Sequence, residues 1–93
     1  MLREEVLDNL ALVPYSSGKP IADFIDQFQN YMAELDTISP TNWNDGRKKK
    51  QLLSNIRTAE GVTHLIQTCR DNVKMTFDQC ALYLRKNYVE QLP

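Results

Sequence analysis

Few residues in the sequence can carry out nucleophilic or metal chemistry: one histidine, His64, and two cysteines, Cys69 and Cys80. Zinc sites need Cys and His ligands at short, regular spacings. His64 and Cys69 are five positions apart, which places them on different faces of a helix, since each residue advances by about 100°. Cys80 is distant in sequence. We therefore expect no metal site, two buried and reduced thiols of an intracellular protein, and a histidine on a helix surface.

The sequence also gives little support for catalysis by a nucleophile or by an acid–base pair. A cysteine or serine nucleophile would depend on His64 as its base, and the three glycines are too isolated to form a phosphate loop. Two carboxylate pairs, Glu4 with Glu5 and Asp23 with Asp26, lie near expected helix starts, where the helix dipole favours negative charge. The sequence therefore predicts a protein without enzymatic activity, cofactor or small-molecule substrate.

The one local concentration of charge is the run Arg47, Lys48, Lys49 and Lys50. It is either a patch that contacts phosphate groups, as in a nucleic-acid-binding module, or a solvated helix face that keeps a small protein in solution. Aromatic residues that would stack on single-stranded bases are missing around it, apart from Trp43. Trp43 is expected either to be buried between helices, which is the usual place of a lone tryptophan, or to lie on a surface used by a partner.

Length and composition indicate one globular domain over residues 1–93. The 42% hydrophobic and 25% charged fractions are ordinary for such a domain, and the length is too short for two cores. The formal net charge of -1 gives no global attraction to nucleic acid or to an acidic membrane. The longest apolar run, residues 10–13, is far below the roughly 20 residues of a membrane span. Charges within residues 1–13 exclude a signal peptide, so we expect a cytoplasmic protein.

Five amphipathic segments are predicted to be helices, near residues 2–13, 20–36, 47–56, 61–70 and 77–89. No segment alternates apolar and polar residues as a strand would. Short helices that are apolar on one side only must pack together to bury those sides. The predicted fold is therefore all-α, a compact orthogonal bundle of about five short helices.

Local signals support the individual helices. In the first, Leu2, Val6, Leu10 and Val13 recur at spacings of four, four and three, and Leu7 and Leu12 widen this stripe, which predicts the buried face of the helix. The last has a capping box in its first turn, formed by Thr76 with the glutamine three positions later.

Four segments share motifs, in the same order, with a known family. Residues 20–28 have the apolar spacing of a long helix, and that helix ends on a leucine within 31–35. Residues 49–56 contain paired leucines with an isoleucine three positions on, and 75–85 open with Met, Thr, Phe and Asp. In these motifs the chain resembles the Gag capsid region of copia-type LTR retrotransposons. The likeness extends over most of the chain.

The resemblance implies a fold like a retroviral capsid lobe and a structural function. Such a lobe presents weak, repeated, symmetric contacts, so that many Gag chains assemble into a shell around RNA. It implies that the partner is a second copy of the chain, as in a dimer or a larger homo-oligomer. RNA would be bound by regions outside this chain, and the location would be the cytoplasm, within virus-like particles.

We expect exposed apolar residues on the first and last helices to carry self-association, because terminal elements are the least enclosed. The candidates are Leu2, Val6 and Tyr88, with Tyr31 and Met32 from the second helix, which has more apolar positions than one face needs. One alternative is a monomeric adaptor that binds a partner helix in a groove. Another is a nucleic-acid-binding module that uses residues 47–50.

Overall fold

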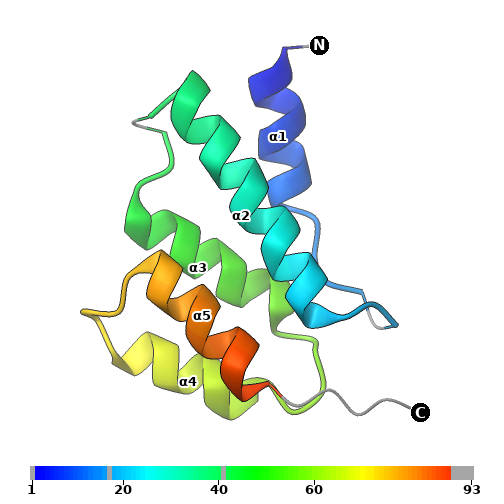
Figure 1. Ribbon diagram of the computed structural model, residues 1–93, viewed down its shortest axis with the longest axis vertical. Helices are drawn as coiled ribbons and strands as arrows, with labels where there is room; N and C mark the ends of the chain where they lie inside the picture. Colours follow the sequence, from blue (N-terminus) through cyan, green and yellow to red (C-terminus); the bar gives the residue numbers. More distant parts are fainter. Residues whose placement is uncertain (1, 17, 41, 89–93) are drawn as a thin grey trace.

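The computed structural model describes residues 2–16, 18–40 and 42–88, and these residues form five α-helices and no β-strand (Figure 1). The helices are α1 (Arg3–Ala11), α2 (Ile21–Ile38), α3 (Asp45–Ile56), α4 (Thr63–Asp71) and α5 (Phe77–Asn87). The predicted all-α class is therefore confirmed. The chain is compact, with a radius of gyration of 13.1 Å, and flat, with extents of 39 × 31 × 17 Å.

The long helix α2 organises the packing, because it contacts α1, α3 and α5 (Figure 1). Its buried residues recur every three or four positions and so form one face of the helix: Ile21, Ile25, Phe28, Met32 and Leu35. α1 lies alongside α2, while α3, α4 and α5 form the other part of the fold. Where the two parts meet, the rings of Phe28 and Phe77 pack edge to face with their centres 5.7 Å apart.

The connection between α2 and α3 contributes Trp43 to the core. Its side chain is 2% exposed, which confirms the expected burial. α3 begins at Asp45, two residues earlier than predicted, because the Asn44 side chain accepts a hydrogen bond from the Arg47 main-chain N–H at 2.8 Å. Such a cap satisfies one of the N–H groups that a helix start leaves without a partner.

The other helix ends also have local causes. α2 continues to Ile38, two residues beyond its predicted end, and the Ser39 N–H closes its last turn on the Leu35 carbonyl at 2.7 Å. α4 begins at Thr63 rather than at the predicted residue 61, because Gly61 has a φ of 78°. That left-handed conformation suits glycine and does not belong to an α-helix.

The predicted capping box of α5 is confirmed, since Thr76 and Gln79 exchange both of its hydrogen bonds. The helix ends at Asn87, and Tyr88 is extended with a ψ of 119°. Residue 89, the predicted last residue, lies outside the described ranges.

The face that α1 buries differs from the predicted one. The prediction was a buried stripe of Leu2, Val6, Leu10 and Val13, widened by Leu7 and Leu12. The structure buries Leu7 together with Ala11 and leaves the other predicted residues exposed or half-buried. The centre of the predicted stripe and the buried face lie roughly 120° apart around the helix axis. The helix is also shorter than the predicted 2–13, since the backbone of Leu2 is extended and Leu12 is the C-cap.

Within the part of the chain that the structure describes, no helix combines the length and the apolar character needed to cross a membrane.

Candidate functional site

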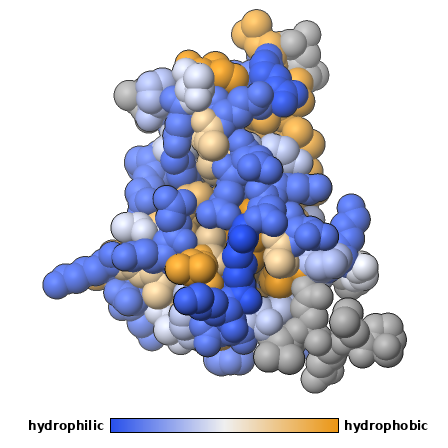
Figure 2. Space-filling view, in the orientation of Figure 1, coloured by the Kyte–Doolittle hydropathy of each residue, from blue (hydrophilic) through white to orange (hydrophobic). Residues whose placement is uncertain are grey.

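An apolar stripe on α1 faces outward. It consists of Leu2, Leu10 and Val13, whose side chains are 69%, 38% and 52% exposed, with Val6 half-buried between them. We call these four residues the α1 stripe. Figure 2 shows hydrophobic side chains along the outer edge of α1, whereas most of the surrounding surface is hydrophilic. An apolar surface that follows one helix is a typical feature of a protein contact.

Polar contacts from the α2–α3 connection determine which face of α1 points inward. The Trp43 indole N–H donates to Oδ1 of Asp8 at 2.7 Å, and the Asn42 side-chain amide donates to Oε1 of Glu4 at 2.6 Å. Glu4 and Asp8 are one turn apart and therefore lie on the same side of the helix. Since both are turned toward the connection, the apolar residues on the other side stay in solvent.

Two further contacts tie α1 at its ends. Near the start, the Arg3 guanidinium forms an ion pair with Glu34 at 2.8 Å. At the end, the buried Asn55 side chain on α3 donates to the Ala11 carbonyl at 2.7 Å. The orientation of α1 is thus fixed by the rest of the chain, and the α1 stripe is held in place without a partner.

A groove runs beside the stripe, between the end of α1, the following connection and α2. Its volume is about 340 Å³. Its apolar lining comes from Leu10, Val13, Pro14, Phe24, Phe28 and Tyr31, with Tyr15 packed edge to face on Phe24 at a centre distance of 5.7 Å. Lys19, Asp23 and Gln27 supply its polar lining. The groove and the α1 stripe share Leu10 and Val13, so together they form one continuous apolar surface.

The structure brings three of the five predicted self-association residues to this surface. Leu2 and Val6 belong to the α1 stripe, and the half-buried Tyr31 lines the groove across from it. The other two lie elsewhere. Met32 is 1% exposed and packs in the core, so its side chain is not available to a partner in this fold.

Tyr88 is the fifth of these residues, and it is half-buried. Its hydroxyl donates to the Glu60 carbonyl at 2.9 Å, which ties the end of α5 to the connection before α4. Its position is therefore explained by a contact within the chain, and it does not belong to the α1 stripe.

The basic run does not form one patch, because successive helix positions point in different directions. The Arg47 guanidinium stacks over the Trp43 ring, 3.7 Å from its centre, and donates to the Asn42 carbonyl at 2.6 Å. Lys48 forms an ion pair with Asp36 on α2. These two cations are engaged in tertiary contacts.

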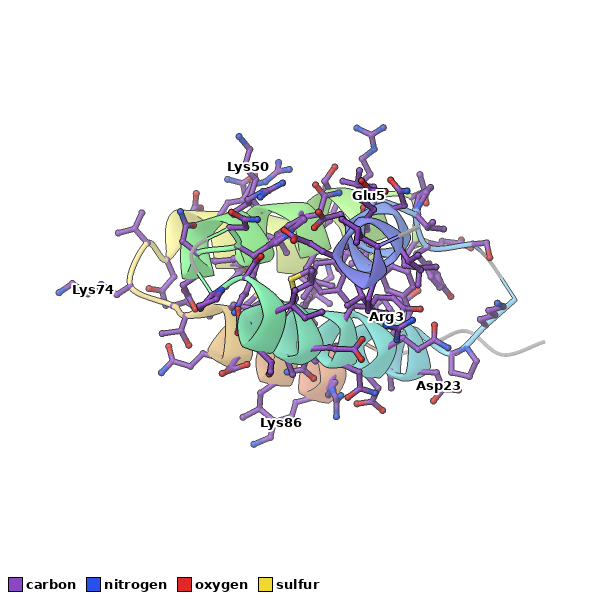
Figure 3. All side chains as sticks on the ribbon, turned by 90° about the horizontal axis from the view of Figure 1, so that it is seen from above. Arg3, Glu5, Asp23, Lys50, Lys74 and Lys86 are labelled. Atoms are coloured by element: carbon purple, nitrogen blue, oxygen red, sulfur yellow. The ribbon has the colours of Figure 1, made fainter. Side chains whose placement is uncertain are left out.

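The remaining two lysines differ from each other. The Lys49 ammonium donates to the carbonyls of Asn72 and Met75, at 2.8 and 3.0 Å, and so holds the connection between α4 and α5. Lys50 is exposed and projects from α3 into solvent (Figure 3). Of the four residues, only Lys50 has a side chain that the rest of the described chain leaves unengaged.

Cys69 and Cys80 are buried and free, as predicted. Burial raises the pKa of the Cys69 thiol above its ordinary value, and burial together with a hydrogen bond to Cys69 raises the pKa of Cys80 further. Both thiols are therefore neutral and poor nucleophiles near pH 7. His64 lies exposed on α4. Among the described residues, no group of three His, Cys, Asp or Glu side chains is arranged to hold a metal ion.

Sequence reasoning placed the α1 stripe in the core, although it also named Leu2 and Val6 as exposed contact residues, and it did not identify the groove. One signal was present: the apolar run over residues 10–13 directly precedes Pro14. A helix cannot turn four consecutive apolar residues toward one core, since they span about 300° of its circumference. Some of them therefore had to be exposed. The residues that decide which of them are exposed lie within 42–55, far from residues 10–13 in the sequence.

Compared with known protein families, curated proteins and solved structures, the chain matches none of them.

Proposed function

We propose that this domain is a structural module that associates with copies of itself through the α1 stripe, in the manner of a Gag capsid lobe. The observation that supports the proposal is the exposed stripe on a helix whose orientation is already fixed. A surface held in its binding conformation avoids the entropy cost of ordering on association. The proposal includes the finer fold assignment, an orthogonal bundle like a retroviral capsid lobe.

A symmetric dimer is the simplest arrangement for such a stripe. Two copies of α1 packed antiparallel about a twofold axis would place Leu2 of one copy near Val13 of the other, and the reverse. The same residues then serve both sides of the contact. No second, complementary surface is needed.

The size of the stripe favours weak association. Burying two stripes contributes roughly 8 kcal/mol, at about 1 kcal/mol for each half-exposed apolar side chain. Association costs about 4–15 kcal/mol in lost freedom of motion. A single contact is therefore weak, and stable assembly requires many contacts that act together. Weak repeated contacts are what a shell-forming protein needs.

The resemblance of the sequence to copia-type Gag capsid regions supports the same proposal. In that setting the domain assembles in the cytoplasm, within virus-like particles, and other regions of a longer chain bind RNA. The domain itself has no catalytic role in this proposal.

Sedimentation velocity over a hundredfold range of protein concentration tests the proposal. We expect the average mass of the natural protein to rise with concentration, and the double variant Leu2→Glu/Leu10→Glu to remain a monomer. The matched control is Val73→Glu/Leu82→Glu, which changes two exposed apolar residues outside the stripe, 87% and 53% exposed. Circular dichroism checks that both variants are folded. Self-association that survives in the stripe variant, or is lost equally in the control, contradicts the proposal.

The groove beside the stripe favours a second candidate, a monomeric adaptor that binds an amphipathic partner helix. Its volume of about 340 Å³ and its aromatic lining suit apolar side chains of such a helix. This candidate predicts a constant monomer mass over the same concentration range. It also predicts that Tyr31→Glu abolishes peptide binding, since Tyr31 lines the groove.

A further inference from the structure

We propose that a hollow between the start of α3 and the end of α4 binds the phosphate groups of a single-stranded nucleic acid. The hollow has a volume of about 270 Å³. It is lined by Gly46, Lys49, Lys50, Leu53, Arg70 and Val73. The site lies away from the α1 stripe, and the proposal does not depend on self-association.

Local charge is the first argument. Three cationic side chains line the hollow, and Arg70 comes from a different helix than Lys49 and Lys50. None of the lining residues is acidic. The whole chain has a net charge of -1, so this concentration of positive charge arises from the fold and not from the composition. Phosphate groups are the ligands that such clusters of Lys and Arg attract.

The cations of the hollow are also available. Lys50 and Arg70 are exposed, and neither side chain has a hydrogen bond or ion pair with the described part of the chain. Lys49 donates to two carbonyls, but an ammonium has three N–H donors and keeps its charge. One donor of Lys49 is therefore left for a phosphate oxygen. Arg47 and Lys48 take no part, because their contacts turn them elsewhere.

The shape and lining of the hollow favour a polymer backbone over a small phosphate. The hollow is shallow, and Lys50 and Arg70 are exposed, so a single phosphate ion would remain largely hydrated. A polyanion gains affinity from the release of its condensed counterions, which does not require burial. No aromatic residue lines the hollow, so bases have nothing to stack on. Binding should therefore be independent of base sequence.

Fluorescence anisotropy with a labelled 20-nucleotide oligo-uridylate tests the site. Three phosphate contacts predict a slope of about −2 for log K against log salt concentration, at about −0.7 for each contact with a single strand. The test variant is Lys50→Glu/Arg70→Glu, which retains the structural contacts of Lys49. We expect it to bind roughly tenfold or more weakly at 50 mM salt, with a slope reduced to about −0.7.

The matched control is Lys19→Glu/Lys86→Glu, which changes the net charge by the same amount. Lys86 lies on the opposite face of the flat molecule from Lys50 (Figure 3), and Lys19 precedes α2. We expect its affinity to stay within about twofold of the natural protein. Equal losses in both double variants would overturn the proposal, as would the absence of binding at 50 mM salt. Circular dichroism confirms folding in each case.

A competition experiment separates the two sources of phosphate. Inorganic tripolyphosphate is added to the complex with the labelled strand. We expect tripolyphosphate to displace the labelled strand only when its concentration of phosphate groups is far above the concentration at which an unlabelled strand does so. If tripolyphosphate competes equally well per phosphate, the hollow is a site for small phosphates, and the nucleic-acid proposal is wrong.

Discussion

The side-chain amide of Asn55 on α3 donates to the main-chain carbonyl of Ala11 at the end of α1, at 2.7 Å. Asn55 is 3% exposed, so this hydrogen bond is shielded from water. Its side-chain oxygen accepts from Gln51 at 2.7 Å, and its main-chain oxygen accepts from the Tyr15 N–H at 2.9 Å. One residue thus ties α3 to both the end of α1 and the connection that follows it.

We predict that Asn55→Ala lowers the free energy of unfolding by about 1–3 kcal/mol, because it leaves the Ala11 carbonyl buried without its side-chain donor. Urea denaturation followed by circular dichroism measures the change. The control is Asn87→Ala, which removes an exposed side-chain donor to the Tyr83 carbonyl and should cost less than about 1 kcal/mol. Equal losses in the two variants would show that the tie to Ala11 contributes nothing.

The bond between Trp43 and Asp8 should be strong, because its acceptor is a carboxylate and its donor is buried. A double-mutant cycle with Trp43→Phe and Asp8→Ala isolates their interaction. We predict a coupling of about 1.5–3 kcal/mol, as for hydrogen bonds to charged groups. Arg47→Ala removes the cation stacked on the indole and its hydrogen bond to the Asn42 carbonyl and should cost about 1–2 kcal/mol. A coupling near zero would contradict the role assigned to this pair.

Adjacent lysines should behave in opposite ways. Lys49→Met removes two hydrogen bonds to the carbonyls of Asn72 and Met75, and we predict a loss of about 1–2 kcal/mol in the free energy of unfolding. Lys50→Met removes an exposed side chain with no hydrogen bond or ion pair to the described part of the chain and should change stability by less than about 0.5 kcal/mol. Thermal melts of the two variants give the comparison. Similar melting temperatures would mean that the Lys49 contacts do not stabilise the fold.

Alkaline pH should destabilise the protein through its two thiols. Burial raises the pKa of both Cys69 and Cys80 in the folded state above the ordinary value of 9.0. Above pH 9 the unfolded chain releases thiol protons that the folded chain keeps. The unfolded state then binds fewer protons, so the free energy of unfolding falls as pH rises, by up to about 1.4 kcal/mol per pH unit for each thiol.

The variant Cys69→Ala/Cys80→Ala tests this pH dependence. We predict that the natural protein loses roughly 1–2 kcal/mol more than the variant between pH 8 and pH 10. Urea denaturation in the presence of a reductant measures both proteins at each pH. All other ionisable groups are present in both proteins, so their contributions cancel in the difference. Parallel losses would show that the thiols ionise equally in the folded and unfolded states.

Much of the fold could be predicted from the sequence because the information is local. The apolar spacing of α2 and the capping box at Thr76 lie within one or two helical turns, so they act before any tertiary contact forms. The burial of Trp43 and of the two cysteines follows from the general cost of exposing such side chains. The helix ends were harder to predict, because they depend on single caps and on the left-handed Gly61.

The candidate sites depend on residues that are far apart in sequence. α1 has apolar residues on two faces, and its own spacing does not decide which face is buried. Trp43, Asn42 and Asn55 decide it by binding polar groups on one side of the helix. In the same way, the four residues of the basic run occupy four different environments. For example, Arg47 stacks on Trp43, and Lys49 donates to the Asn72 carbonyl just after α4.

By itself, therefore, the sequence determined the all-α class and the burial of Trp43 and the two cysteines, since helix periodicity and hydrophobicity are properties of short segments or single residues. Only the tertiary structure decided that the α1 stripe faces solvent and that Arg70 joins Lys50 at one hollow. The physical reason is that a face stays exposed only when no other part of the chain covers it, and the residues that could cover it are distant in sequence.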